Sequence, residues 1–308
     1  MSNPTSHFVT TRDGLKLHVR SYGPRAATAL PVVCLPGLAR TGGDFDPLAR
    51  ALAGDAEHPR CVLAIDYRGR GLSDYDSNAD NYSLPVELAD VLTVLSALEI
   101  RRAVFVGTSR GGLIAMLLGS ARPGAIAGVV LNDIGPVIEM PGLMRIKGYV
   151  GMLQQPKSFE EAAELLRQLF GPQFTALTPQ EWMAQARRTF REQGGSIVPD
   201  YDPKLARVLR DVDSERPPPP LWEQFDSLAR MPMLIIRGAN SDLLSAATFE
   251  AMRARRRQCE TLVVPDQGHA PLLTDDGTIG RIGAFVRFCE LQPEAAAVSR
   301  AAEAGPEP

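Results

Sequence analysis

The sequence predicts an α/β fold, because short apolar runs alternate with segments of helical periodicity. The runs are continuous and rich in β-branched residues, as in strands that are buried on both faces of a parallel sheet. The segments between them space their apolar residues as helices covering such a sheet do. Six runs fit this description, at residues 32–35, 61–65, 103–107, 128–131, 233–237 and 261–264.

Two further strands are expected before this alternation, at residues 8–10 and 15–21. Asp13-Gly14 lies between them and is a strong signal for a tight hairpin turn. The sheet should therefore begin with an antiparallel pair and continue as a mostly parallel, doubly wound sheet. The clearest helical segments of the first half are 85–95 and 113–118.

The alternation stops between residues 136 and 228, where Gln, Glu, Arg and Met occur at helical spacing and no convincing strand is present. Residues 159–166 and 179–183 are helix-like, and four prolines at 217–220 indicate a stiff connector. We therefore expect a core at 8–135 and 229–291, interrupted by a helical insertion at 136–228. The tail at 292–308 is rich in Ala, Glu and Pro and is expected to be disordered.

Composition narrows the class of protein. The chain has 308 residues, 44% of them hydrophobic, and a formal charge of −3. It lacks the basic surplus that nucleic-acid binding requires. The four cysteines have no CxxC spacing and no neighbouring His cluster, so we expect free buried thiols and no metal site. No leader or membrane-length apolar segment is evident, which favours a cytoplasmic protein without a membrane partner.

The segment GTSRG at residues 107–111 matches G-x-S-x-G, between an expected strand and an expected helix. In that setting Ser109 stands on a sharp turn with strained backbone, and larger residues at the glycine positions would collide with the adjoining strand and helix. The start of the helix offers free N–H groups to a developing negative charge. An ordinary structural turn would explain the motif taken alone. Whether Ser109 is a nucleophile therefore depends on whether the chain also offers a suitable base and acid.

A serine nucleophile needs a base, and His269 is the best-placed histidine. It lies in a loop directly after the last expected strand, where α/β folds place their sites. Of the other three histidines, His7 lies in the N-terminal segment, His18 in an early expected strand and His58 in a polar loop.

Two aspartates could orient the histidine. Asp242 follows the strand at 233–237, and we prefer it as the triad acid by position and order. Asp133 follows the preceding strand and stays open as the alternative. A helix cap or a loop hydrogen bond would explain either residue without catalysis.

The chain order Ser, Asp, His and the nearby motifs resemble the α/β-hydrolase superfamily, in its serine-nucleophile branch with a helical cap. The similarity extends from residue 8 to residue 291. DYRGRGLSD at 66–74 is similar to the family's structural D-x-R-G-x-G-x-S turn. LPGL at 35–38 is similar to its oxyanion loop, with Pro36 where histidine commonly stands. The resemblance implies an oxyanion hole formed by the backbone N–H groups of Leu38 and Arg110.

These observations predict a serine hydrolase that cleaves a carboxylic ester or a lactone through an acyl-enzyme, without a cofactor. The resembling family also includes enzymes that cleave carbon–carbon bonds in 1,3-diketone-like compounds with the same triad, and this alternative stays open. A non-catalytic ligand receptor on the same fold is a further alternative. The substrate is expected to be a small molecule, and the protein a monomer or a homodimer.

The insertion is expected to cover the site and shape the substrate pocket. Trp182, Met140 and Met144 are the first candidates to line it, followed by Met152, Phe170, Phe174 and Phe190. Arg110 follows the nucleophile directly, and its side chain either packs on the turn or faces an acidic group of the substrate. We favour packing slightly.

Overall fold

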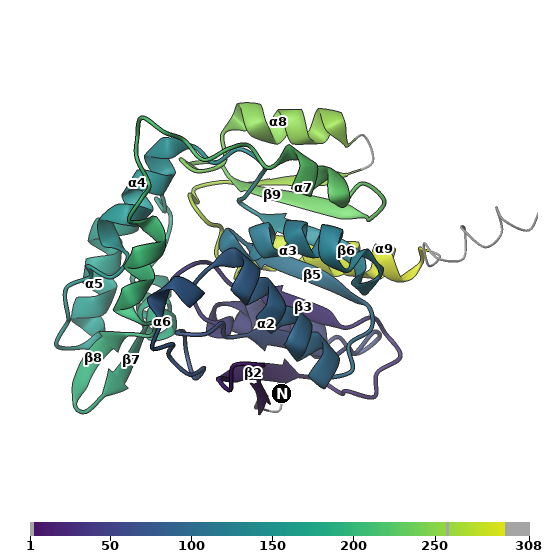
Figure 1. Cartoon of the computed structure of the whole chain (residues 1–308), viewed down its shortest axis with the longest axis horizontal. Coiled ribbons are helices and arrows are strands. Elements are labelled where there is room, and N and C mark those ends of the chain that lie inside the picture. Colours follow the sequence, from purple (N-terminus) through teal and green to yellow (C-terminus); the bar gives the residue numbers. More distant parts are fainter. Residues whose placement is uncertain (1–2, 257–258, 293–308) are drawn as a thin grey trace, which may run out of the picture.

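An eight-stranded sheet forms the centre of the computed structural model, which describes residues 3–256 and 259–292 (Figure 1). The strand order is β1-β2-β4-β3-β5-β6-β9-β10. The strands of this sheet are β1 (Thr5–Thr10), β2 (Lys16–Tyr22), β3 (Val32–Leu35), β4 (Val62–Ile65), β5 (Ala103–Thr108), β6 (Ile126–Asn132), β9 (Met233–Gly238) and β10 (Glu260–Val264). The expected tail at 292–308, apart from Gln292, lies outside the described residues.

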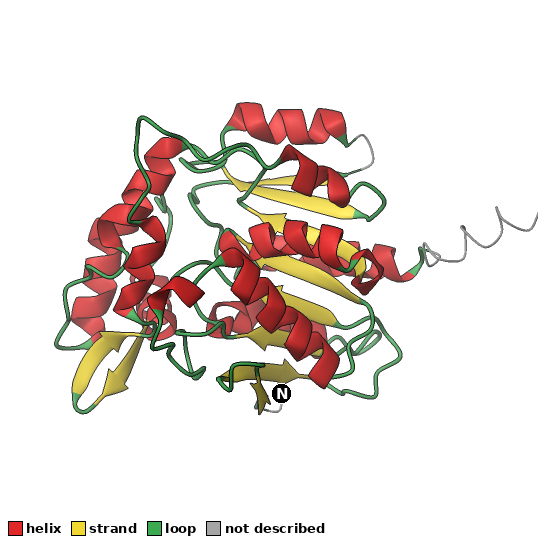
Figure 2. Ribbon diagram, in the orientation of Figure 1, coloured by secondary structure: helices red, strands yellow, loops and turns green. Residues whose placement is uncertain are grey.

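Helices lie on both faces of this sheet (Figure 2). The α-helices are α1 (Asp46–Ala53), α2 (Leu84–Ala97), α3 (Arg110–Ala121), α4 (Met140–Tyr149), α5 (Phe159–Phe170), α6 (Pro179–Thr189), α7 (Trp222–Ser227), α8 (Ala246–Arg255) and α9 (Asp276–Glu290). Short 3-10 helices occur at η1 (Gly42–Phe45), η2 (Ala79–Asn81), η3 (Pro123–Ala125) and η4 (Pro203–Leu209).

Strand β2 pairs antiparallel with both β1 and β4, and the remaining neighbours in the large sheet pair in parallel. The predicted α/β class, the mostly parallel sheet and its antiparallel start are therefore confirmed. No helix within the described residues has the length and apolar character needed to cross a membrane.

The central strands bury side chains on both faces, which explains their continuous apolar sequences. On β3, Val33 and Leu35 join the apolar cluster beneath α2 and α3, while Val32 and Cys34 join the cluster beneath α1 and α9. None of the four cysteines, all of which are described, forms a disulfide, and all except the half-buried Cys259 are buried.

The strand order reverses around β3, because β4 and β5 lie on its two sides. The loops that leave the carboxyl ends of β3 and β5 therefore diverge to opposite faces and open a crevice between them. Ligand sites of α/β sheets occupy such a crevice. This topology places the loop after Leu35 beside the turn after Thr108.

Between β6 and β9 the chain leaves the sheet and forms a cap over the carboxyl ends of the strands, on the left of Figure 1. We use "cap" for α4, α5, α6, η4 and the hairpin of β7 (Phe190–Gln193) and β8 (Ser196–Pro199). The cap buries an apolar cluster of its own, in which Leu166, Trp182 and Phe190 are almost fully inaccessible. Helix α7 lies outside it and packs against α3, where Ser227 Oγ donates to the Met116 carbonyl at 3.0 Å.

The hairpin corrects the prediction that the insertion contains no strand. Gly194 and Gly195 form its turn with φ values of 59° and 78°, which the two-residue turns of hairpins require. The flanking strands are only four residues long and mostly polar, so they give little periodic signal. The Gly-Gly pair at 194–195 is the one local feature that indicates them.

Candidate active site

Ser109 occupies the turn between β5 and α3 with φ 52° and ψ −115°. A left-handed φ is costly for a residue with a side chain, and it persists only where the surroundings enforce it. The Ser109 N–H donates to the Asn132 carbonyl at 3.0 Å, which ties this turn to the end of the neighbouring strand β6. The side chain is thereby presented at the carboxyl edge of the sheet.

The glycines of the motif are required by close backbone approach. A Cβ at Gly111 would lie 1.9 Å from the Leu35 carbonyl oxygen, and a Cβ at Gly107 would lie 2.6 Å from the Gly111 backbone. Contacts this short do not occur, so any side chain at either position would push the turn away from β3 or from the helix start. The expected steric role of these glycines agrees with the structure.

The structure brings His269 into contact with Ser109. Its Nε2 atom lies 2.9 Å from Ser109 Oγ, and its Nδ1 atom lies 2.8 Å from Asp133 Oδ2. When Nδ1–H donates to the carboxylate, Nε2 is left to accept the serine hydroxyl. The histidine comes from the loop after β10, as the sequence predicts.

Asp133 follows β6 directly and is fully buried, with a left-handed φ of 56°. Besides the histidine, two donors reach its carboxylate. The Gly238 N–H donates to Oδ1 at 2.7 Å, and the Ser241 hydroxyl donates to Oδ2 at 2.5 Å. These contacts satisfy a buried charge and fix the direction in which the carboxylate faces the imidazole.

The preference for Asp242 as the partner of His269 is wrong. Arg145 of α4 donates to both oxygens of Asp242, at 2.7 and 2.8 Å, so this carboxylate faces the cap. Burial alone would raise the pKa of Asp242, but hydrogen bonds from Arg145 and Gln173 and the positive charge of Arg145 together hold the pKa below its ordinary value. The two aspartates follow adjacent strands, yet only Asp133 turns towards the histidine.

The loop after β3 approaches the serine. A Cβ at Gly37 would lie 3.8 Å from Ser109 Cβ, so the adjoining Leu38 stands beside the nucleophile. Within the described chain, neither the Leu38 N–H nor the Arg110 N–H donates to another protein group. Both donors thus remain available near Ser109, as an oxyanion hole requires.

The Arg110 side chain points away from the pocket. Its Nε donates to Glu87 at 2.5 Å and its Nη2 donates to the Tyr82 carbonyl at 2.9 Å. Only 7% of the residue is exposed. Of the two roles left open for this side chain, packing under the turn is the one that the structure supports.

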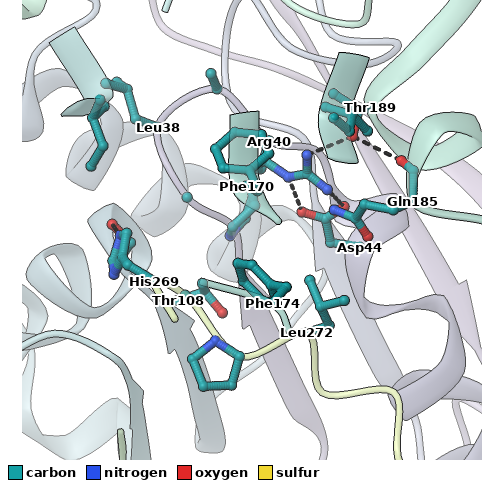
Figure 3. Close-up of a pocket in the computed structure, with 18 of the residues that line it drawn as sticks. Leu38, Arg40, Asp44, Thr108, Phe170, Phe174, Gln185, Thr189, His269 and Leu272 are labelled. Atoms are coloured by element: carbon teal, nitrogen blue, oxygen red, sulfur yellow. Dashed lines mark hydrogen bonds and ion pairs between the residues drawn. The ribbon is translucent and has the colours of Figure 1, made fainter. Parts of the chain in front are cut away.

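A mostly apolar pocket opens above Ser109 and His269, with walls from the core loops and from the cap (Figure 3). Trp182, Phe170 and Phe174 line it, as expected. Further apolar walls include Leu38, Ala39, Phe45, Ile146, Val150, Leu153, Leu166, Leu177, Leu272 and Leu273.

Met140 and Met144 do not line the pocket that the described residues form, which corrects their assignment. Helix α4 contributes Ile146 and Tyr149 instead, and Met144 is 39% exposed on another face of the helix. Met152 and Phe190, the weaker candidates, are also absent from the lining. The composition of α4 does not reveal which of its faces turns towards the sheet.

One corner of the pocket is polar, and no sequence motif indicates it. Arg40 donates to both oxygens of Asp44 at 2.5 Å and to Thr189 Oγ1 at 2.6 Å. Thr189 in turn donates to the Gln185 carbonyl at 2.8 Å. Figure 3 shows these side chains gathered on the side of the pocket away from His269. We call Arg40, Asp44, Gln185 and Thr189 the polar corner.

Comparisons with known proteins agree with this architecture. Residues 32–280 match the model of the "Alpha/beta hydrolase family". A 3-hydroxybutyrate-oligomer hydrolase of Cupriavidus necator is 33% identical over 287 residues, covering 90% of this chain and 96% of that protein. An sn-1-specific diacylglycerol lipase of Mus musculus is 26% identical, covering 79% of this chain and 76% of the lipase. The crystal structure of an alpha/beta hydrolase from Novosphingobium aromaticivorans superposes with a TM-score of 0.86 at 38% identity, covering 93% and 99% of the two chains.

Proposed function

This chain belongs to the alpha/beta hydrolase family, and from that premise we propose that it hydrolyses carboxylic esters through an acyl-enzyme on Ser109. The observation that carries the proposal is the continuous hydrogen-bonded series from Ser109 Oγ through His269 to Asp133. Such a series activates a hydroxyl that is otherwise a weak nucleophile at neutral pH. Relatives named as an oligomer hydrolase and as a lipase support ester chemistry.

In the first half-reaction, Ser109 Oγ attacks the ester carbonyl carbon and its proton passes to His269 Nε2. The carbonyl electrons move onto oxygen, where the N–H groups of Leu38 and Arg110 stabilise the negative charge. Asp133 stabilises the imidazolium without taking its proton. The tetrahedral intermediate then re-forms its carbonyl, the bond to the alkoxy oxygen breaks, and His269 protonates the departing alcohol.

In the second half-reaction, water attacks the carbonyl carbon of the acyl-enzyme. His269 takes a proton from this water and returns it to Ser109 Oγ as the acid departs. The same oxyanion donors serve both steps because the carbonyl oxygen stays in one place.

We further propose that the acyl group or the alcohol carries an oxygen function, as in short oligoesters of hydroxy acids. The Cupriavidus relative is named for such an oligomer. The polar corner supports this substrate class, because Arg40 is neutralised by Asp44 and the pair suits an uncharged hydroxyl or ester carbonyl better than a second charge. The apolar walls would contact the hydrocarbon segments.

The test combines labelling by a fluorophosphonate probe with turnover of p-nitrophenyl butyrate and of a 3-hydroxybutyrate trimer. We expect wild type to be labelled and active on both esters, and Ser109→Ala and His269→Ala to lose both properties. Ser96→Ala and His58→Ala, at exposed positions outside the site, are the matched controls and should behave as wild type. A wild-type protein that neither reacts with the probe nor cleaves either ester would refute the proposal.

A further inference from the structure

We propose that Glu87 is a positioning residue whose carboxylate holds both backbone donors of the oxyanion hole, those of Leu38 and Arg110, in their reactive geometry. The inference rests on the ester hydrolysis proposed above and adds a residue outside the pocket. Glu87 lies on α2, and neither the pocket lining nor any sequence motif includes it.

The contact with Arg110 is direct. Glu87 Oε2 accepts from Arg110 Nε at 2.5 Å, while Arg110 Nη2 donates to the Tyr82 carbonyl. The guanidinium is therefore held at two points beneath the nucleophile turn. Because the Arg110 N–H is the first donor of α3, fixing this residue fixes the direction of that donor.

The contact with Leu38 passes through Arg70. Glu87 Oε1 lies 2.7 Å from Arg70 Nη1, and Arg70 Nε donates to the Leu38 carbonyl at 2.8 Å. Arg70 Nη1 also donates to the Arg68 carbonyl at 2.7 Å. The oxyanion loop is thus attached to the same carboxylate as the helix start, although the two segments are far apart in the sequence.

The assembly is shielded from water. Glu87 and Arg70 are fully buried, and the ring centroids of Tyr67 and Tyr82 each lie 5.6 Å from the Arg70 guanidinium carbon. Burial by itself raises the pKa of Glu87, but Arg70 and Arg110 outweigh it and hold the pKa below its ordinary value. Removing one member of such a buried ion group destabilises a protein strongly, because it leaves an uncompensated buried charge. The intact group is by itself weak evidence for stabilisation, which leaves room for a role in fixing geometry.

Positioning and charge predict opposite results for one substitution. Glu87→Gln removes a negative charge and leaves two guanidinium groups near the oxyanion, so a purely electrostatic role would preserve or raise kcat. A positioning role predicts a loss, because displacing a donor by about 1 Å costs about 100-fold in rate. Only the second outcome fits our inference.

The experiment measures kcat and KM of p-nitrophenyl butyrate hydrolysis for wild type, Glu87→Gln and Glu87→Asp, with the affinity for an alkyl trifluoromethyl ketone that forms a tetrahedral adduct. We expect Glu87→Gln to lower kcat about 100-fold and to weaken inhibitor affinity in proportion, while KM changes little. Glu87→Asp keeps the charge on a shorter arm and should recover part of the loss.

Asp90→Asn is the matched control. Asp90 lies one turn further along α2, is 3% exposed, and forms a buried bidentate pair with Arg68 at 2.7 Å for both contacts. It does not contact Leu38 or Arg110. We expect Asp90→Asn to lower thermal stability as much as Glu87→Gln does and to keep wild-type kcat.

Several results would overturn the inference. Wild-type kcat in Glu87→Gln would do so, as would equal losses of kcat in Glu87→Gln and Asp90→Asn. If Glu87→Gln does not fold, Arg70→Lys tests the same inference and should likewise lower kcat. A lysine cannot contact Glu87 and the Leu38 carbonyl together as the guanidinium fork does. Absence of wild-type labelling and turnover would instead refute the proposed function, and the inference with it.

Discussion

Asp133 Oδ2 lies 2.8 Å from His269 Nδ1, although 136 residues of chain separate the two side chains. The carboxylate is completely inaccessible and takes further hydrogen bonds from Gly238 and Ser241. This relationship fixes which ring nitrogen faces Ser109. It also distinguishes Asp133 from Asp242, whose carboxylate is occupied by Arg145.

Asp133→Asn should reduce kcat for ester hydrolysis by about 10⁴-fold, because an amide can no longer favour the imidazole tautomer that accepts the serine proton. Asp242→Asn should keep kcat within about threefold of wild type, since Asp242 does not contact the histidine. The measurement is steady-state turnover of p-nitrophenyl butyrate by purified variants with matching circular dichroism spectra. A larger loss in Asp242→Asn than in Asp133→Asn would contradict the assignment.

Gly111→Ala should destabilise the protein by about 3 kcal/mol, because the new methyl group would overlap the Leu35 carbonyl and force the turn apart. Urea unfolding monitored by tryptophan fluorescence measures the change. Gly124→Ala is the control, since a Cβ there meets nothing within 4 Å. Similar free energies of unfolding for the two variants would argue against a crowded turn.

Arg40→Gln should lower kcat/KM for a 3-hydroxybutyrate trimer about tenfold more than for p-nitrophenyl butyrate. The trimer would lose hydrogen bonds between its oxygen atoms and the charged guanidinium of Arg40. The simple alkyl ester does not extend an oxygen into the polar corner, so its turnover is the internal control. Parallel assays of both substrates give the ratio. An equal effect on the two esters would mean that the corner only links the core to the cap.

Trp182→Ala should shift the acyl-length preference towards longer chains, because this ring closes part of the pocket and packs edge-on against Phe174. The measurement is kcat/KM across p-nitrophenyl esters from acetate to decanoate. Met144→Ala, on the outer face of α4, should keep the wild-type profile. Identical profiles for Trp182→Ala and wild type would remove Trp182 from the pocket wall.

The ion pair of Arg145 and Asp242 should stabilise the protein at neutral pH and lose this effect in acid. In the folded state the pKa of Asp242 is held below its ordinary value. The stabilisation is therefore fully present above the unfolded pKa of about 3.9 and is lost as pH falls through the lower, folded pKa. Asp242→Asn should therefore be less stable than wild type at pH 7, by about 1 kcal/mol for this partly exposed pair, and equally stable in strong acid. Thermal unfolding across pH measures the gap, with Asp211→Asn at an exposed pair as control. A gap in stability that stays the same from pH 7 into strong acid would contradict the explanation.

The sheet and the nucleophile turn could be predicted because their signals are local. Strands such as β3 and β5 are continuous apolar runs, and the glycines around Ser109 mark the one conformation that fits between strand and helix. His269 was identifiable because the other histidines lie in unsuitable segments. In each case the neighbouring residues carry the information.

The partner of the histidine and the pocket walls depend on how distant segments meet. Asp133 and Asp242 both follow strand ends, and only the left-handed backbone at Asp133 turns its carboxylate into the site. Likewise, the sequence of α4 leaves open which face meets the sheet, so Ile146 rather than Met144 lines the pocket. Arg40 and Glu87 act through contacts with other elements and have no motif of their own.

The separate apolar cluster of the cap has a consequence for how such a protein changes over generations. All the proposed reacting groups come from loops of the sheet, whereas much of the pocket wall comes from α4, α5 and α6. Substitutions in the cap can thus reshape the space for an acyl chain while the packing of the sheet stays intact. New substrate ranges can arise in this protein without rebuilding its chemistry.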